Sequence, residues 1–444
     1  MRAVTSAQVA VIGAGPSGLA AARQLLAVGV EPVVFEKAGD IGGNWLFDAD
    51  TGHASVYENT HIISSKTLSQ YEDFPMPDDY PDYPGHRQLL AYFRAYAEHF
   101  DLKRVIRFRH EVRSASPVDD GAWQLDWRDD QGKMHSQRFS HLVVCNGHHW
   151  DPRLPEYPGS FDGPMVHSGD FRRMDDSWRD KRVLVIGAGN SACDVAVEAC
   201  RVTPHVFLSM RRAQWFVPKF LFGKPVDKLA EKSLWMPARL RQWLMKRLLL
   251  TVQGKHSAYG LPDPEWGPFE AHPTLNQDLL PLIRHGRILP RPGIERFDGD
   301  GVVFVDGQRD AIDVIIAATG FRITFPFFDP ELIDYSESLQ VPLYRKMLHP
   351  EHPNLYFIGL FQPLGCIWPL SDHQARVAAA EIIGQYQRPD DLEKAIADEL
   401  AHPHFHFQKS TRHSTEVEYH RFRAELVKEL KAGRQRAGRA RQAA

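Results

Sequence analysis

The sequence predicts an α/β fold built on two parallel sheets, because one strand–turn–helix pattern occurs twice. The first copy joins the apolar run Val9–Ile12 to a glycine turn at residues 13–18, and the second joins Val183–Ile186 to a turn at residues 187–192. Such a turn brings the backbone close to a pyrophosphate, which then meets the free N–H groups of the helix N-terminus. Two copies indicate two dinucleotide-binding domains of the Rossmann type in one chain.

Composition is that of an ordinary globular protein, with 43% hydrophobic residues, 25% charged residues and a formal net charge of -3. This charge argues against general nucleic-acid binding. The four cysteines show no disulfide or zinc spacing, and no signal peptide precedes the first strand, so we expect a cytoplasmic protein. No apolar run reaches the ~20 residues of a membrane span. Residues 233–252 are basic and amphipathic, and either form a solvated helix or lie on a membrane or over a substrate channel.

The order of elements predicts that the second domain is inserted into the first. We expect a first part of the FAD domain at residues 1–160 and an NADPH domain with a helical insertion at 161–310. The strand at 314–318 and the one at 355–359 are expected to return to the FAD domain, at 311–430. The last segment, 431–444, is polar and basic, and we expect it to be disordered.

The first nucleotide site is predicted to hold FAD. Glu36 ends the second strand of this unit, 23 residues after Gly13, where a carboxylate can accept hydrogen bonds from both hydroxyls of an unphosphorylated ribose. A further pair of glycines follows at residues 42–45, and Thr319-Gly320 and Gly359 end later apolar strands. The expected FAD-binding residues are Gly13, Gly15, Pro16, Ser17, Gly18, Glu36, Lys37, Gly43, Asn44, Trp45, Thr319, Gly320 and Gln362.

The second nucleotide site differs at the equivalent strand end. Ser209 and Met210 replace the carboxylate, and Arg211 and Arg212 follow. A guanidinium group can make two charge-assisted bonds to a 2′-phosphate, so this site is predicted to prefer NADPH to NADH. The alternative is that both arginines are surface charges. The expected NADPH-binding residues are Gly187, Gly189, Asn190, Ser191, Ser209, Arg211 and Arg212.

The segment 161–171 fits the pattern F-x-G-x-x-x-H-x-x-x-[F/Y], with Gly163, His167 and Phe171 at its fixed positions. Placed between two glycine turns, this pattern resembles the class B flavin-containing monooxygenases. Further stretches match that family in the same order, among them residues 58–60, 73–77, 145–149, 209–211 and 362–365. The resemblance runs from about residue 9 to residue 376.

The resemblance implies a mechanism. In this family NADPH reduces FAD, reduced flavin reacts with O2 to give a C4a-hydroperoxyflavin, and a soft nucleophile of a small substrate takes one oxygen atom. Asn59 matches the family's active-site asparagine, and His167 matches a histidine that couples the domains. The resemblance places Gln362 near the isoalloxazine ring and makes Trp368 a candidate pocket wall, with a core role as the alternative. A homodimer is a family expectation.

Departures from the family pattern bear on the substrate. Phe171-Arg172 stands where dedicated Baeyer–Villiger enzymes usually have tryptophan and proline, which favours oxygenation of an amine nitrogen or a sulfide sulfur. Residues 272–281 are similar to the plant branch that decarboxylates an indole keto acid. Ketone oxidation and oxidative decarboxylation therefore stay as alternatives. The apolar tail of the animal members is missing, which implies a soluble, bacterial-type enzyme.

Three other readings are weaker. A flavin-dependent disulfide reductase needs a redox pair beside the flavin, commonly Cys-x-x-Cys, whereas Cys193 and Cys200 are six residues apart by intervening count, on the helix after the second turn. A non-catalytic flavin sensor would lack the monooxygenase matches. His402, His404 and His406 could hold a metal, but a surface loop is the simpler interpretation, and we expect no metal.

Overall fold

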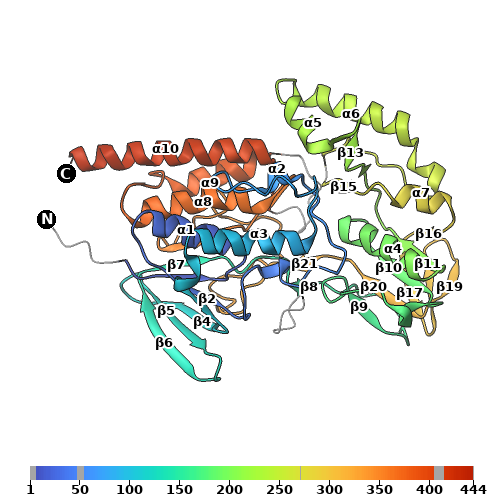
Figure 1. Cartoon of the computed structure of the whole chain (residues 1–444), viewed down its shortest axis with the longest axis horizontal. Coiled ribbons are helices and arrows are strands. Elements are labelled where there is room, and N and C mark those ends of the chain that lie inside the picture. The colour runs from blue at the N-terminus through green and yellow to red at the C-terminus, as the bar shows by residue number, and fades with distance from the viewer. Residues whose placement is uncertain (1–6, 48–54, 271, 405–414, 444) are drawn as a thin grey trace. The chain divides into compact units, whose positions relative to one another are not determined.

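The computed structural model describes residues 7–47, 55–270, 272–404 and 415–443 (Figure 1). The chain divides into two compact units, each made of segments distant in sequence. Unit 1 contains residues 1–55, 64–151 and 322–444, and unit 2 contains residues 56–63 and 152–321. The expected insertion of one domain into the other is therefore found, with junctions at 151/152 and 321/322. Residues 56–63 are an unexpected addition to unit 2.

Unit 1 is built on a five-stranded parallel sheet. Its order is β22 (Leu355–Phe357), β7 (His141–Val144), β1 (Val9–Ile12), β2 (Val33–Glu36) and β3 (Ile106–Phe108). These short strands are mostly buried apolar residues, as expected for a parallel sheet covered on both faces. The strand expected at 355–359 does return to this unit.

Helices and smaller sheets complete unit 1. Helix α1 (Pro16–Ala27) begins directly after the first glycine turn and packs against α8 (Ile367–Ile382), which in turn packs against α10 (Tyr419–Ala443). The other helices are η1 (Gly43–Trp45), α2 (Lys66–Ser69), α3 (His86–His99), η2 (Leu102–Val105) and α9 (Leu392–Ala401). An antiparallel sheet contains β4 (Glu111–Pro117), β5 (Trp123–Arg128) and β6 (Met134–Phe139), and β23 (Gln362–Pro363) pairs with β24 (Glu416–Val417).

Unit 2 repeats the parallel architecture. Its sheet has the order β16 (Ile288–Arg291), β11 (Val206–Ser209), β10 (Val183–Ile186), β20 (Val314–Ala317) and β9 (Met165–His167). Strand β20 pairs with β10 along four residues, so the expectation that it returns to the FAD domain is wrong. The apolar run is equally compatible with either sheet, and only the pairing partner assigns it.

The remaining elements of unit 2 cover this sheet or extend from it. Helix α4 (Asn190–Val202) follows the second glycine turn. The other helices are η3 (Asp176–Trp178), α5 (Val226–Lys232), α6 (Ala238–Gln253), η4 (His256–Tyr259) and α7 (Leu279–Arg284). The other strands are β12 (Phe216–Val217), β13 (Phe220–Leu221), β14 (Lys224–Pro225), β15 (Thr274–Leu275), β17 (Ile294–Asp298), β18 (Gly301–Phe304) and β19 (Arg309–Ala311). Strands β8 (Asp151–Pro152) and β21 (Phe321–Arg322) lie at the junctions.

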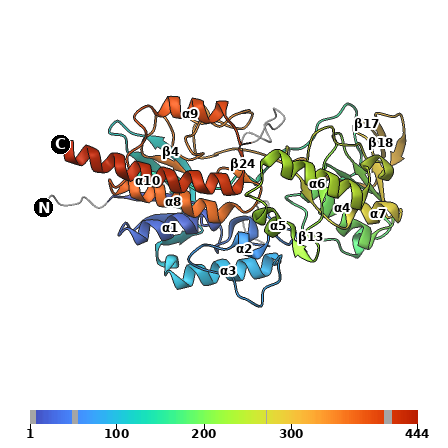
Figure 2. The same cartoon turned by 90° about the horizontal axis from the view of Figure 1, so that it is seen from above.

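The basic segment 233–252 falls largely on α6 (Figure 2). Only Leu249 on this helix is buried, whereas Trp243 is 53% exposed and the preceding Trp235 is 82% exposed. Within the described residues, no helix combines the length and apolar character needed to cross a membrane.

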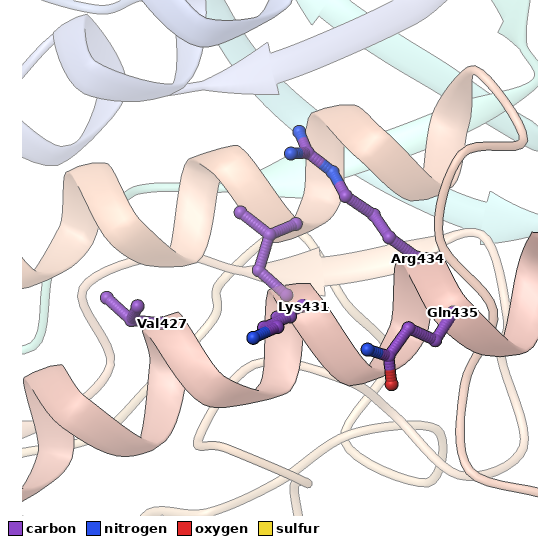
Figure 3. A pocket seen from close by; sticks show the side chains of 5 residues that line it. Val427, Lys431, Arg434 and Gln435 are labelled. Carbon is purple, nitrogen blue, oxygen red and sulfur yellow. The ribbon is translucent and has the colours of Figure 1, made fainter.

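The C-terminal segment also departs from expectation. Residues 431–443 continue α10, so the expectation of a disordered tail is wrong. Val427, Leu430, Lys431, Arg434 and Gln435 line a shallow hollow along this helix (Figure 3).

Candidate active site

The first glycine turn is shaped by backbone contacts that exclude side chains. Gly13 has φ of 101°, and a Cβ there would come within 2.6 Å of the carbonyl oxygen of Cys145 at the end of β7. A Cβ at Gly18 would collide with the Gly13 carbonyl. Gly43, from the glycine pair at residues 42–45, packs on Gly15, since a Cβ added to Gly43 would lie 3.2 Å from the Gly15 Cα. With no side chains at these positions, the backbone can approach a pyrophosphate, which the first N–H groups of α1 can bind because they have no partner within the helix.

Glu36 is the last residue of β2, as the sequence predicts for a ribose-binding carboxylate. Its side chain is buried, and its two oxygens accept hydrogen bonds from the backbone N–H groups of Ala14 (2.7 Å) and Ala38 (2.8 Å). Burial raises the pKa of Glu36, although these hydrogen bonds act in the opposite direction. Each carboxylate oxygen keeps a second lone pair, so ribose hydroxyls can still donate to it.

Apart from Thr319 and Gly320, the other predicted residues of the first site lie in unit 1. The Ser17 hydroxyl bonds to Ser371 on α8 at 2.9 Å, and the Pro16 carbonyl accepts the Tyr71 hydroxyl at 2.7 Å. The Lys37 ammonium lies 5.6 Å from the centre of the Trp150 ring. Asn44 and Trp45 form η1 with Gly43, and the Asn44 amide donates to the His149 carbonyl at 3.4 Å.

Trp368 lies within an aromatic cluster of unit 1. It is 6% exposed, and its ring meets those of Trp45 and Phe93 edge to face, with centroids 5.8 Å and 5.2 Å away. Its indole N–H donates to the Ser69 carbonyl. Trp368 therefore packs as a core residue, and its contact with Trp45 links that core to the segment 42–45.

Two polar side chains lie against each other past the carboxyl ends of strands of the first sheet. The imidazole of His148 and the Oε1 of Gln362 are buried, and they interact without forming a well-aligned hydrogen bond. Burial lowers the pKa of His148 to about 4, so the ring is neutral at pH 7. Buried polar atoms normally form well-aligned hydrogen bonds, so this pair is consistent with a bound polar ligand. Sequence reasoning assigned no role to His148; its place four residues past the end of β7, a parallel strand, was the available signal.

The second glycine turn has the same architecture with different chemistry. Gly187 has φ of 141°, and a Cβ there would lie 2.5 Å from the Ala318 carbonyl oxygen after β20. Gly189 is the N-cap of α4, and the exposed Ser191 lies in its first turn. The Asn190 side chain is already engaged, since its Oδ1 accepts the Leu275 N–H at 2.7 Å.

At the end of β11, no carboxylate faces the turn. The Ser209 hydroxyl donates to the Pro292 carbonyl at 2.7 Å, and Met210 is buried. Arg211 and Arg212 are exposed, and Arg211 lies against Gly293, which offers no side chain. The second site is therefore electropositive at the position where the first site has Glu36.

Thr319 and Gly320 belong to unit 2, not to the FAD domain as expected, because they follow β20. The Thr319 hydroxyl donates to the Arg153 carbonyl at 2.5 Å, and the Gly320 carbonyl accepts from His167 Nε2 at 2.9 Å.

The signature residues support the backbone of unit 2. His167 accepts the Gly169 N–H at Nδ1 (3.0 Å) and donates from Nε2 to Gly320, so its tautomer is fixed. Burial lowers its pKa, which keeps the ring neutral. A Cβ at Gly163 would lie 2.7 Å from the Asp313 carbonyl oxygen, and Phe171 is buried. His167 therefore holds the backbone at Gly320, next to Phe321, the last residue of unit 2.

Asn59 lies in the segment of unit 2 that comes from the N-terminal part of the chain. Its side chain is exposed, and its Nδ2 donates to Glu198 Oε2 on α4 at 2.7 Å. One turn earlier on the same helix, Asp194 accepts from Asn276 at 2.8 Å, and burial raises its pKa to about 6. Sequence reasoning assigned no role to Glu198 or Asp194, since both lie inside an ordinary helix pattern.

Among the described residues, the four cysteines form no disulfide, and the histidines join no cluster of three metal-ligating side chains. All four cysteines are buried and free, and Cys193 and Cys200 both lie on α4. Over the described residues, no three histidine, cysteine or acidic side chains gather as metal ligands. His404 is engaged with Glu425 at 3.1 Å, and His406 lies outside the described residues.

Comparison with known proteins gives a consistent result. The family model described as flavin-binding monooxygenase-like matches residues 6–435. Mouse flavin-containing monooxygenase 5 is 37% identical over 407 residues, covering 87% of this chain and 75% of the mouse protein. Rat dimethylaniline monooxygenase (N-oxide-forming) 2 is 35% identical over 403 residues, covering 86% and 75%.

Solved structures show the same fold. The S-allyl-L-cysteine S-oxygenase of Allium sativum aligns with a TM-score of 0.69 and 21% identity, covering 96% of this chain and 88% of its own. Cyclohexanone monooxygenase with bound epsilon-caprolactone aligns with a TM-score of 0.71 and 18% identity, covering 96% and 98%.

Proposed function

Because this chain belongs to the flavin-binding monooxygenase-like family, we propose that it holds FAD in unit 1 and NADPH in unit 2 and transfers one oxygen atom from O2 to a small organic substrate. The oxygen acceptor is the nitrogen of an amine or the sulfur of a sulfide. A cytoplasmic location and a homodimer are part of the same proposal, to be tested by cell fractionation and light scattering.

The observation that carries the cofactor assignment is the contrast between the two strand ends. Glu36 is a buried carboxylate in unit 1, and Arg211 and Arg212 are exposed guanidinium groups in unit 2. A carboxylate accepts hydrogen bonds from ribose hydroxyls and repels a 2′-phosphate, whereas a guanidinium group binds that phosphate. The difference supports an unphosphorylated adenosine ribose, as in FAD, in the first site and NADPH in the second.

The residues of unit 1 fit FAD. The first glycine turn and the N-terminus of α1 would hold the pyrophosphate, and Glu36 would accept from the ribose. The neutral imidazole of His148 and the Oε1 of Gln362, which form no well-aligned hydrogen bond with each other, offer polar groups to the edge of a flavin. Bound FAD supplies the chemistry that takes a hydride and activates O2. The protein's own task is binding, orientation and exclusion of water.

The residues of unit 2 fit a nicotinamide nucleotide. The N-terminus of α4, with Gly187 and Gly189 before it, would hold the pyrophosphate, and Arg211 would hold the 2′-phosphate. Asn59 cannot exchange protons near neutral pH, so it can orient a cofactor or substrate by hydrogen bonding without protonating it.

Heteroatom oxygenation is favoured over ketone oxidation. Phe171 is buried in the core of unit 2 where dedicated Baeyer–Villiger enzymes usually have tryptophan, and the rat relative is named for forming the N-oxide of dimethylaniline. The garlic protein is named as an S-oxygenase, and cyclohexanone monooxygenase shares the fold at 18% identity.

The test is a coupling measurement on the FAD-loaded protein. Consumption of NADPH and O2 is followed beside product formation with dimethylaniline, methyl phenyl sulfide, cyclohexanone and an indole keto acid. We expect close to one N-oxide or sulfoxide per NADPH and little hydrogen peroxide. A preference for the lactone or the decarboxylated product would move the assignment to one of the two alternatives. NADPH oxidation that yields only hydrogen peroxide with all four substrates would contradict the proposed function.

A further inference from the structure

Residues 56–63 belong to unit 2, although the described residues on both sides of them belong to unit 1. Three contacts fix this loop on unit 2. The Tyr57 ring lies 5.9 Å from that of Phe171, the Glu58 N–H donates to the Arg172 carbonyl at 2.8 Å, and Asn59 bonds to Glu198. Since all three partners come from unit 2, the position of Asn59 is set by that unit.

The loop also holds its own shape. The Tyr57 N–H donates to the Thr60 hydroxyl and the Thr60 N–H donates to the Tyr57 carbonyl, both at 3.0 Å. His61 Nδ1 lies 2.8 Å from the Asn59 carbonyl. Asn59 therefore lies in a closed turn, and its backbone is placed before its side chain makes any contact.

Glu198 decides which way the Asn59 amide faces. Its side chain is 12% exposed and is held from the other side by Arg201, whose Nη1 lies 2.5 Å from Glu198 Oε1. An ionised carboxylate can only accept hydrogen bonds, so the amide nitrogen of Asn59 must be the atom that faces Glu198. The amide carbonyl oxygen is then not engaged by Glu198, and it has no hydrogen-bond partner among the described residues.

We propose that Glu198 is a positioning residue that presents the Asn59 carbonyl oxygen, as an acceptor, to the nicotinamide nucleotide. The nucleotide has matching donors in its carboxamide N–H2 group and its ribose hydroxyls. This inference rests on the proposed function, because it takes the second glycine turn as the site of NADP(H). Asn59, Glu198 and that turn are all carried by unit 2, with Glu198 and the turn joined by α4.

The test is a double-mutant cycle read out as the dissociation constant of NADP⁺ for the FAD-loaded enzyme. We expect Asn59→Ala and Glu198→Ala each to weaken NADP⁺ binding about five- to tenfold, the effect of one lost hydrogen bond between uncharged groups. The double variant should bind no more weakly than Asn59→Ala alone, because Glu198 acts only through Asn59. Glu198→Gln should keep most of the affinity, since its amide oxygen still accepts from Asn59.

The matched control is Asp176→Asn. It removes another ion pair between residues three apart in unit 2, Asp176 with Arg179, and it should leave NADP⁺ affinity unchanged. In the Glu198 variants the KM for NADPH should rise with little change in the rate of flavin reduction at saturation. Flavin content and melting temperature should stay at the wild-type values.

Independent effects of the two alanine substitutions, or unchanged NADP⁺ affinity in Glu198→Ala, would overturn the inference. If Glu198→Ala does not fold, Asn59→Asp tests the contact between residues 59 and 198 by a change at residue 59. It sets two carboxylates against each other and should weaken NADP⁺ binding more than Asn59→Ala; adding Glu198→Gln should restore affinity, and a failure of that rescue counts against the inference. A wild-type protein that binds no FAD or does not react with NADPH would contradict the proposed function instead.

Discussion

At the scale of single residues, the two proposed nucleotide sites differ in charge at one strand end. Sequence position alone identified this difference, because the distance from a glycine turn to the end of the next strand is fixed by the geometry of a strand–helix–strand unit. The structure adds that the Ser209 hydroxyl is already bonded to Pro292, so the exposed arginines are the groups available to a 2′-phosphate.

Arg211→Ala tests this charge difference. The substitution should weaken NADPH binding about tenfold or more while changing NADH binding less than twofold, because only NADPH carries the 2′-phosphate. The measurement is the KM for each nucleotide in flavin reduction. Arg287→Ala is the comparison, since its guanidinium group is engaged with the Cys200 carbonyl. Equal losses for both nucleotides would remove the assignment of Arg211 to the 2′-phosphate.

Asp194 gives a pH-dependent prediction. Burial raises its pKa from 3.8 to about 6 in the folded protein, so between pH 4 and 6 the native state binds a proton that the unfolded chain does not. The free energy of unfolding therefore decreases as pH rises through this window, and the full penalty is present above pH 6. Asp194→Asn should be more stable than wild type by about 1–3 kcal/mol at pH 8, with little difference at pH 4.

The measurement is chemical denaturation of both proteins at the two pH values. Asp306→Asn, which replaces an exposed carboxylate of the same unit, should show no such pH-dependent gain. A variant that is less stable at pH 8 would show that the charge of Asp194 contributes favourably through Lys219.

At the scale of elements, the sequence correctly predicted the features that are set by residues close together in the chain. The two glycine turns, their strands and the helices after them are found where the sequence predicts them, because each strand–turn–helix unit is formed by residues that follow one another in the chain. Strand β20 was assigned to the wrong sheet, since a four-residue buried strand reads the same beside either partner. Asn59 was identified by resemblance, but its place on unit 2 depends on contacts with residues more than 100 positions away.

Helix α10 was missed for a related reason. Its end has many arginines and little apolar character, so composition favoured disorder. The buried face is formed by Phe422, Leu426, Glu429 and Ala437, spaced three, four or eight residues apart. Gly433 lies on the same face, where a Cβ would collide with the Tyr386 ring. A buried acid and a glycine replace apolar side chains in this pattern, and that hides the amphipathic signal.

Glu429 connects α10 to two tyrosines elsewhere in unit 1. Burial by itself would raise the pKa of its carboxyl, but hydrogen bonds from Tyr344 (2.6 Å), Arg436 and Tyr386 (2.9 Å) lower it overall. Glu429→Ala would leave two buried hydroxyls without their acceptor and should cost about 2–3 kcal/mol of stability. Thermal and denaturant unfolding measure this loss. Lys428→Ala, on the exposed side of the same turn, should change stability by less than about 0.5 kcal/mol. Equal effects of the two substitutions would show that α10 is not held through Glu429.

At the scale of the whole molecule, the chain crosses between the two units four times: around residues 55 and 63, and at 151/152 and 321/322. The last two crossings enclose the inserted unit. The first two carry one short loop onto unit 2 and back. A ligand of unit 2 therefore acts on a segment whose flanking residues belong to unit 1.

This arrangement predicts how each cofactor protects the backbone in amide hydrogen exchange. A ligand stabilises the unit that binds it by about 2.7 kcal/mol at a hundredfold excess over its dissociation constant. FAD should slow exchange in α1, β2 and β22, whereas NADP⁺ added to the FAD-loaded enzyme should slow exchange in α4 and in residues 56–63. Residues 64–69, which follow the loop but belong to unit 1, should respond to FAD and not to NADP⁺. In Glu198→Ala the NADP⁺ response of residues 56–63 should shrink while that of α4 persists. A loop that follows FAD instead would mean that its contacts with Phe171, Arg172 and Glu198 do not set its position, and that unit 2 does not place Asn59.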